Sequence, residues 1–254
     1  MKEYQLQCFF QENPKAVLGF SGGVDSAYLL WAGLRAGAQI RPYFIKTPFQ
    51  PMFELDDAKR LAGQLGTELM VLEIDILEDA EVAENPQNRC YYCKRKLFGA
   101  LKEQASRDGY SLLLDGTNAS DNNSDRPGMK AAKELEVCSP LRDFGFSKEE
   151  IRRYSKRAGL FTWDKPAYAC LATRIPSGRR ISADVLEKIE IGEGALAELG
   201  FSDFRIRLYG EAARIQLPAE QMAMALERRA EIRRVLQPWF DGAFLDLQER
   251  CGQR

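Results

Sequence analysis

Short apolar runs alternate with longer amphipathic stretches through the first half of the chain, and this alternation limits the possible folds more than any other feature of the sequence. The apolar runs at 16–20, 40–47, 68–75 and 111–116 each have the length of one buried strand. Helical patterns separate them, and the stretch at 54–66 places leucines and alanines on one face before it ends at a glycine. The pattern therefore predicts an α/β fold: a parallel sheet covered by helices, with ligands at the carboxyl ends of the strands.

The last quarter of the chain follows a different pattern. A helical stretch at 182–200 precedes alternating apolar and polar residues over 203–217, which are typical of a β-hairpin. One further helix is predicted over 218–240. We therefore expect two domains, a parallel-sheet α/β domain over 1–180 and a smaller α+β domain over 181–254.

The composition excludes several kinds of chemistry. Histidine is absent from all 254 residues, so the chain has no Ser-His-Asp triad and no His-ligated zinc or haem. Lysine and arginine number 36 against 37 acidic residues, and a net charge of −1 does not favour nucleic acid as a partner. No apolar run approaches the roughly 20 residues of a membrane helix, and the N-terminal residues lack the apolar core of a signal peptide. We expect a cytoplasmic protein without a membrane partner.

The strongest local signal is the loop GFSGGVDS, which directly follows the first expected strand and directly precedes a helix. Gly22 and Gly23 permit tight turning and close approach to an anion. The hydroxyls of Ser21 and Ser26, together with the backbone N–H groups of the helix start, suit a phosphate group, and Asp25 suits magnesium or the loop itself. The loop contains no lysine and is not a Walker A sequence. A glycine-rich turn without a ligand is the alternative, but the strand–loop–helix context favours nucleotide binding.

A second polar loop, DGTNASDNNSDRPG, follows the fourth expected strand. Gly116 allows close approach of a ligand, while Thr117, Asn118 and Asp121 offer contacts to ribose, phosphate or Mg²⁺. Arg126 is placed to bind pyrophosphate or an acidic substrate. The composition also suits an ordinary polar turn. The position at a strand's carboxyl end favours function.

Cys90 and Cys93 form a C-x₂-C pair, but the chain has no second pair and no histidine to complete a zinc site. Cys170 lies far along the sequence, in a basic loop rich in glycine and proline. Three thiolates suit a 4Fe–4S cluster with one iron left without a protein ligand. Inert thiols are the alternative. Arg174 in the same loop is placed to meet an anion.

The motifs SGGVDS, NRCYYCK, DGTNASD…RPG, SPL (139–141) and PAYACLATRIPSG (166–178) occur together and in this order. The set resembles the LarE family, the ATP-dependent pyridinium-3,5-biscarboxylic acid mononucleotide sulfurtransferases of the PP-loop ATP pyrophosphatase superfamily. The resemblance runs from residue 15 to residue 217. It implies a PP-loop α/β domain with a smaller α+β domain. It also implies an enzyme that uses ATP and Mg²⁺ to adenylate a carboxylate of this small-molecule nucleotide, and then replaces AMP by sulfur. The product leads to the nickel-pincer nucleotide, the cofactor of lactate racemase.

The family has two branches that differ in the source of sulfur. In one branch, the cysteine at the position of Cys170 gives up its sulfur and is left as dehydroalanine. In the other, three cysteines hold a 4Fe–4S cluster, and Cys90, Cys93 and Cys170 make this chain similar to that branch. We expect Cys170, Arg174 and Asp121 to act in catalysis and the protein to form homo-oligomers, as family members do. Three hairpin residues resemble the family's phosphate-binding residues: Arg205, Arg207 and Arg214.

Three other functions stay open at this point. Enzymes of tRNA 2-thiolation also combine a PP-loop with a three-cysteine cluster, although a near-neutral chain does not favour RNA as the substrate. An adenylating synthetase resembling NAD synthetase leaves the three cysteines unexplained. A nucleotide sensor without enzymatic activity would be distinguished from the enzymes by the absence of pyrophosphate release.

Overall fold

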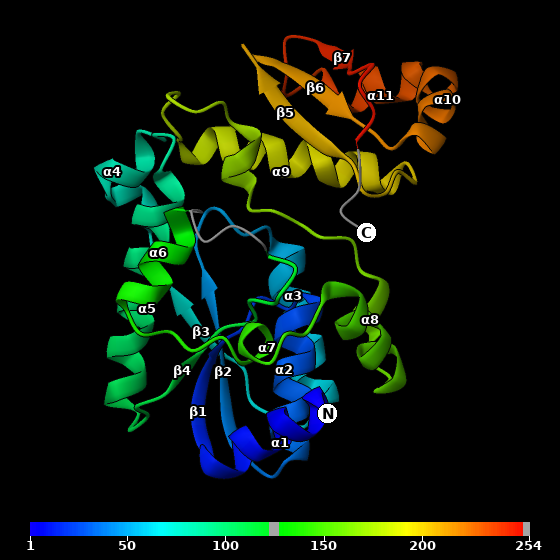
Figure 1. Cartoon of the computed structure of the whole chain (residues 1–254). Helices are drawn as coiled ribbons and strands as arrows, with labels where there is room; N and C mark the ends of the chain where they lie inside the picture. Colours follow the sequence, from blue (N-terminus) through cyan, green and yellow to red (C-terminus); the bar gives the residue numbers. More distant parts are fainter. Residues whose placement is uncertain (122–126, 251–254) are drawn as a thin grey trace. The chain divides into compact units, whose positions relative to one another are not determined.

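The computed structural model describes residues 1–121 and 127–250 (Figure 1). The chain divides into two compact units, of which the first comprises Met1–Ile76 and Asn88–Lys165 and the second comprises Leu77–Gln87 and Pro166–Arg254. The second unit thus takes up the residues between 166 and 180 and a short segment from the first half of the chain. The domain assignment of 1–180 and 181–254 stays a prediction.

The first unit is built on a four-stranded sheet with the order β3-β2-β1-β4, in which all neighbouring strands are parallel. The predicted α/β fold with a parallel sheet is therefore confirmed. In chain order the elements are α1 (Lys2–Glu12), β1 (Lys15–Gly19), α2 (Val24–Arg35), β2 (Gln39–Lys46), α3 (Met52–Gln64), β3 (Met70–Glu73), η1 (Ile76–Glu78, at the junction with the second unit), α5 (Arg89–Arg107), β4 (Leu113–Leu114), α6 (Pro127–Glu134), α7 (Pro140–Asp143), α8 (Lys148–Arg157) and η2 (Phe161–Asp164).

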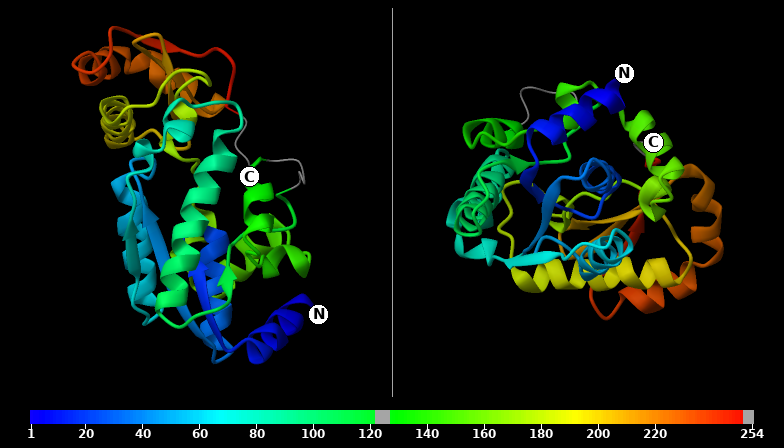
Figure 2. Two further views of the ribbon diagram at one scale, coloured as in Figure 1. Left: turned by 90° about the vertical axis from the view of Figure 1, so that its left-hand side faces the viewer. Right: turned by 90° about the horizontal axis from the view of Figure 1, so that it is seen from below.

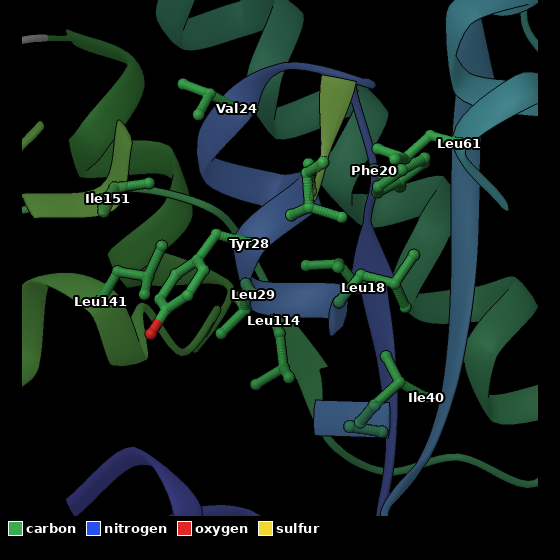
Figure 3. Packing of buried hydrophobic residues seen from close by; sticks show 14 of the residues in the cluster. Leu18, Phe20, Val24, Tyr28, Leu29, Ile40, Leu61, Leu114, Leu141 and Ile151 are labelled. Carbon is green, nitrogen blue, oxygen red and sulfur yellow. The ribbon is translucent and has the colours of Figure 1, made fainter. Parts of the chain in front are cut away.

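Helices cover both faces of this sheet, because successive side chains of β1 point to opposite sides. Ala16 and Leu18 are fully buried in a cluster with residues of α1, α2, α3 and α8 (Figure 3). Val17 packs on the other side, against Leu101 and Ala105 of α5. The views in Figure 2 show α5 and α2 on either side of the strands. This burial on both faces explains why the sequence of β1 is a continuous apolar run rather than an alternating pattern.

The second unit contains a three-stranded sheet with the order β5-β6-β7, antiparallel between β5 and β6 and parallel between β6 and β7. Its elements are α4 (Ala80–Ala83), η3 (Leu171–Arg174), α9 (Ala183–Glu198), β5 (Arg205–Tyr209), β6 (Ala212–Gln216), α10 (Ala219–Glu227), α11 (Arg229–Leu236) and β7 (Ala243–Leu245). Backbone hydrogen bonds join the 77–87 segment to this unit, from Gly178 N to Asn85 O and from Ile181 N to Ala83 O.

The prediction of a single helix over 218–240 is wrong, because two helices occupy this region and meet at Arg228. The backbone of Arg228 leaves helical geometry, with φ −93° and ψ 15°. Its guanidinium donates to Leu199 O and forms a salt bridge with Glu231 at 2.6 Å. The contact with Leu199 forms only in the folded unit, and the helical periodicity of the sequence continues through Arg228 with no sign of the break.

Helix α1 was not predicted from the sequence. Only Leu6 and Phe10 of its side chains are buried, so its apolar stripe is narrow. Within the part of the chain that the structure describes, every helix is too short or too polar to cross a membrane.

Candidate functional site

The loop between β1 and α2 has the backbone geometry that the sequence predicts. Gly22 has a φ of 69°, in the left-handed region that glycine adopts without strain. A Cβ at this position would lie 3.2 Å from the backbone of Ala58 in α3, so the loop also passes close to that helix. Gly23 then forms the N-cap of α2. The loop therefore presents the unpaired N–H groups of the first turn of α2, together with the positive end of its dipole.

Two hydroxyl groups converge on the same turn. Ser21 Oγ and Ser26 Oγ lie 3.2 Å apart, and Ser26 Oγ donates to Gly23 O at 3.2 Å. The backbone N–H of Gly23 approaches Ser21 Oγ at 3.4 Å. Ser26 is buried while Ser21 is exposed, so the pair reaches from the helix start to the surface. This arrangement suits a phosphate group.

The loop after β4 lies against the phosphate loop. Asp115 is buried and its carboxylate accepts hydrogen bonds from Thr117 Oγ1 and Ser139 Oγ, both at 2.6 Å. A Cβ on Gly116 would lie 2.8 Å from the backbone N of Ser26. The two polar loops thus meet at one edge of the sheet, as expected for strands whose carboxyl ends point the same way.

Gly116→Ala is expected to destabilise the fold by about 1–3 kcal/mol and to raise the KM for ATP, because the new methyl group meets backbone that has no room to move aside. Gly99→Ala in the middle of α5 is the matched control, since a Cβ there has no neighbour within 4 Å. That variant should be neutral or more stable by about 0.5–1 kcal/mol. Thermal unfolding and ATP kinetics measure both effects. Equal melting temperatures for the two variants would contradict the close packing of the loops.

Asp25, Asn118 and Asp121 come together beside the phosphate loop. Asp25 Oδ1 accepts from Asn118 Nδ2 at 3.3 Å, and Asp121 Oδ2 accepts from the backbone N of Asn118 at 3.0 Å. Lys148 Nζ forms a salt bridge with Asp25 Oδ2 at 2.5 Å. Burial raises the pKa of Asp25 above its usual value; Lys148 opposes this shift and the charge of Asp121 adds to it. A nearby cation therefore stabilises the ionised form of the Asp25 carboxylate.

Lys148 was not predicted from the sequence as a site residue. Lys148 and its ionic partner Asp25 are 123 positions apart in the sequence. In sequence it stands only as the first residue of α8, after the N-cap Ser147. Among the residues predicted for the second polar loop, Arg126 lies outside the described residues.

In the second unit, Cys170 is half-buried and stands at the N-cap of η3. Thr173 Oγ1 donates to Cys170 O at 2.8 Å. Arg174 is 1% exposed and its guanidinium forms two hydrogen bonds to Glu193, Nε to Oε1 at 2.8 Å and Nη2 to Oε2 at 3.2 Å. Arg174 Nη1 donates further to Ala169 O at 3.0 Å. A fourth hydrogen bond runs from Arg174 Nη1 to Thr173 Oγ1. Arg174 therefore donates four hydrogen bonds, to helix α9 and to the loop around Cys170.

Glu193 was likewise not predicted from the sequence, since its position in α9 belongs to no motif. Besides Arg174, its carboxylate accepts from Tyr168 Oη at 2.6 Å and from the backbone N of Ile206 at 2.9 Å. Burial alone would lower the pKa of Arg174, but the hydrogen bonds and charge of Glu193 raise it, and the thiolate form of Cys170 adds to the rise. The hydrogen bonds of Glu193 therefore fix the position of the chain on both sides of Cys170.

The three hairpin arginines share one face of the β5–β6 pair but differ in exposure. Arg205 is buried, donates to Phe204 O and Ala167 O, and has a pKa lowered to about 10 by burial and by the charges of Arg174 and Arg250. Arg207 and Arg214 are partners in the strand register. Arg207 donates to Thr173 O at 2.7 Å, and burial together with the charges of Arg174 and Arg214 lowers its pKa.

Cys90 and Cys93 lie near the start of α5, in the first unit, whereas Cys170 belongs to the second unit. Cys90 is exposed and Cys93 is half-buried. Over residues 1–121 and 127–250, no three side chains of Cys, Asp or Glu are grouped as metal ligands.

Comparison with known proteins agrees with this geometry. The chain is 29% identical over 93% of its length to the pyridinium-3,5-bisthiocarboxylic acid mononucleotide synthase of Lactiplantibacillus plantarum, and covers 86% of that protein. It is 36% identical to an uncharacterized protein of Synechocystis, over 85% of this chain and 81% of the relative. A tRNA-specific 2-thiouridylase of Thermotoga maritima is 25% identical over 58% of this chain and 52% of that enzyme.

No family model matches the chain. The similarity to the bisthiocarboxylic acid mononucleotide synthase nevertheless extends over nearly the full length of both proteins, and the similarity to the thiouridylase covers little more than half of each. The predicted phosphate loop stands at the end of β1, where a PP-loop belongs, and the second polar loop packs against it. The chain belongs to the LarE family, a PP-loop family of ATP-dependent sulfurtransferases.

Proposed function

We propose that this enzyme converts a carboxylate of a pyridinium-3,5-dicarboxylic acid mononucleotide to a thiocarboxylate, in the synthesis of the nickel-pincer nucleotide. The observation that carries the proposal is the turn formed by Ser21, Gly22 and Gly23 at the start of α2. The similarity to the bisthiocarboxylic acid mononucleotide synthase supports the choice of substrate.

The first step is activation of the carboxylate. A carboxylate oxygen of the substrate attacks the α-phosphorus of ATP, the bond to the bridging oxygen breaks, and pyrophosphate leaves with the electron pair. We assign the N–H groups of the first turn of α2 and the hydroxyls of Ser21 and Ser26 to the phosphates. The acyl adenylate that forms has AMP as a good leaving group.

Mg²⁺ would be held by Asp25 and Asp121 together with ATP phosphates, which is the usual mixture of carboxylate and phosphate ligands for this ion. The residues fit the ion, because the pKa of Asp25 is raised by burial and by Asp121, and both effects favour a cation nearby. Lys148 supplies one such charge at 2.5 Å. The ion would neutralise the charge that develops on the pyrophosphate.

The second step is attack of a sulfur nucleophile on the acyl carbon, with departure of AMP. A thiolate or sulfide is a competent nucleophile at neutral pH, so the reaction needs no histidine base. We assign the phosphate of the substrate to Arg207 and Arg214, whose like charges face each other in the strand register and have one carboxylate nearby, that of Asp246, 3.2 Å from Arg214 Nε. Arg174, with its guanidinium bound to Glu193, acts as a positioning residue for Cys170.

For the sulfur source we propose a 4Fe–4S cluster held by Cys90, Cys93 and Cys170. The donor chemistry fits, because clusters are held by cysteine thiolates, and Cys90 and Cys93 lie one helical turn apart on α5. When bound, a cluster with three cysteine ligands leaves one iron open to sulfide, so that sulfur is supplied without loss of a side chain. A cytoplasmic location and a homo-oligomeric state stay predictions.

Release of pyrophosphate tests the proposal. We expect the pyridinium dicarboxylate mononucleotide to stimulate release of pyrophosphate from ATP, and unmodified transfer RNA to leave it unchanged. The 2-thiouridylases that resemble part of the chain make tRNA the appropriate competing substrate. Stimulation by tRNA alone, with thiolated tRNA as the product, would replace the proposal by tRNA 2-thiolation.

Replacement of Cys90, Cys93 or Cys170 by alanine is expected to remove both bound iron and sulfur transfer, while Cys8→Ala serves as the control. The wild-type protein should turn over repeatedly with sulfide, and its mass should not change. Iron analysis and intact-protein mass spectrometry after one anaerobic turnover measure this. Loss of the elements of hydrogen sulfide from Cys170, in protein that never held iron, would show instead that this residue is consumed.

A further inference from the structure

A pocket of about 1070 Å³ lies within the second unit, between helices α10 and α11 and strand β7 (Figure 1). Part of its wall is apolar and is formed by buried or half-buried side chains, namely Ile215, Ala225, Ile232 and Leu245. The volume is that of a site for a small organic ligand. The reaction steps assigned above use none of the residues that line this pocket.

The pocket lies on the opposite face of the sheet from the arginines assigned to the substrate phosphate. Ile215 of β6 lines the pocket, and its neighbour Arg214 points to the other face, because successive side chains of a strand alternate. Leu245, the partner of Ile215 in β7, lines the pocket as well. Arg207 is the partner of Arg214 in the register and shares its face. A ligand in this pocket is therefore separate from the substrate phosphate.

The lining carries three arginines and one carboxylate, namely Arg229, Arg233, Arg234 and Asp241. Arg229 and Arg233 stand four positions apart on α11, so their side chains are neighbours on the helix surface and their charges repel. Within residues 1–121 and 127–250, neither of them forms a salt bridge, and the guanidinium of Arg229 donates to Leu226 O at 3.1 Å. An anion bound between the two guanidinium groups would remove this repulsion and accept charged hydrogen bonds.

The pocket also offers groups that a simple anion would not use. Trp239 lines it, is 42% exposed, and stacks on no other ring in the described part of the chain, so its face is open to a flat ring. Gln237 can both donate to and accept from the edge of a base. Asp241 repels a bare anion, but a carboxylate accepts hydrogen bonds from ribose hydroxyls. An aromatic ring, a ribose and one phosphate together match this set.

We propose that this pocket is a nucleotide site separate from the phosphate loop. It binds a nucleoside monophosphate with the phosphate between Arg229 and Arg233, the base against Trp239 and the ribose hydroxyls on Asp241. The chain belongs to an ATP-dependent family, so an adenine nucleotide is the member of this class that the protein meets. The inference does not rest on the proposed reaction, because it concerns binding in the second unit and not the group that is adenylated.

Titration with AMP, followed by tryptophan fluorescence, tests the site. We expect AMP to quench the fluorescence of Trp239, and Trp239→Phe to remove this signal. Arg229→Ala combined with Arg233→Ala should weaken the binding that this signal reports by about tenfold or more, as for loss of charged hydrogen bonds. The matched control is Arg107→Ala combined with Arg153→Ala, which removes two arginines from exposed positions on α5 and α8. Neither double variant should have a lower melting temperature.

Asp241→Ala distinguishes a nucleoside monophosphate from a simple anion. We expect this variant to bind AMP more weakly, because an acceptor for the ribose hydroxyls is lost, and to bind inorganic phosphate more tightly, because a repelling charge is lost. Tighter binding of both compounds would overturn the nucleotide assignment. Equal affinity for AMP in the wild type and the Arg229, Arg233 double variant would also overturn it. No binding of AMP, with a smaller oligomer in that double variant, would assign this face to contact between copies of the chain.

Discussion

The double variant Ser21→Ala, Asp25→Ala is expected to release no pyrophosphate in the presence of ATP and the pyridinium substrate, with kcat/KM reduced at least ~100-fold. Removal of one preorganised donor in an active site commonly has an effect of this size. Here a hydroxyl beside the start of α2 and the carboxylate assigned to Mg²⁺ are lost together. A steady-state assay of pyrophosphate release measures the loss.

The fold of this double variant should survive. Ser21 is exposed, and burial raises the pKa of Asp25, so ionised Asp25 is held in the folded state at a cost. The matched control is Ser106→Ala, Asp56→Ala, which removes the same groups from exposed positions on α5 and α3. Normal substrate-dependent pyrophosphate release by the folded double variant would rule out the phosphate loop as the ATP site.

Glu193→Gln is expected to lower the free energy of unfolding by about 3–5 kcal/mol, because it leaves the guanidinium of Arg174 buried without a counter-charge. Arg174 is 1% exposed and Glu193 is 6% exposed, so solvent screens the pair little. Urea denaturation measures the loss. Glu187→Gln, at an exposed position on the same helix, should leave the stability unchanged.

The Glu193 variant also tests the positioning of Cys170. Tyr168 and Ala169 precede Cys170 and Arg174 follows it, and all three are held directly or through Arg174 by Glu193. We expect sulfur transfer to fall more than pyrophosphate release in Glu193→Gln. Arg174→Met combined with Glu193→Gln should regain stability, since no uncompensated charge remains, but not sulfur transfer. Equal loss of both activities would indicate that Glu193 only stabilises the fold.

The sheet of the first unit was predictable because its central strand β1 is apolar on both faces and because a helix separates each strand from the next. The phosphate loop was predictable because its glycines, its hydroxyls and its place between β1 and α2 depend on local sequence alone. The break at Arg228 was not predictable, because the helical periodicity continues through it, and the contact of its guanidinium with Leu199 O forms only in the folded chain.

The parts of the candidate site that sequence missed are those formed by pairing over long distances in the chain. Lys148 meets Asp25 across the sheet edge, and Glu193 reaches Arg174 from a different helix. Arg174 was expected to bind an anion and does so, but the anion is this carboxylate of the protein. Charge and hydrophobic periodicity identify such residues as polar positions on helices, and only the folded chain shows which partner each one has.

The most direct test of sulfur transfer to a pyridinium carboxylate is mass spectrometry of the small-molecule product. The protein is incubated anaerobically with ATP, Mg²⁺, sulfide and the pyridinium dicarboxylate mononucleotide. We predict a product in which one carboxylate oxygen is replaced by sulfur, with one AMP and one pyrophosphate formed for each sulfur transferred. Formation of AMP and pyrophosphate with no sulfur in the mononucleotide would contradict the assignment and indicate an adenylating synthetase.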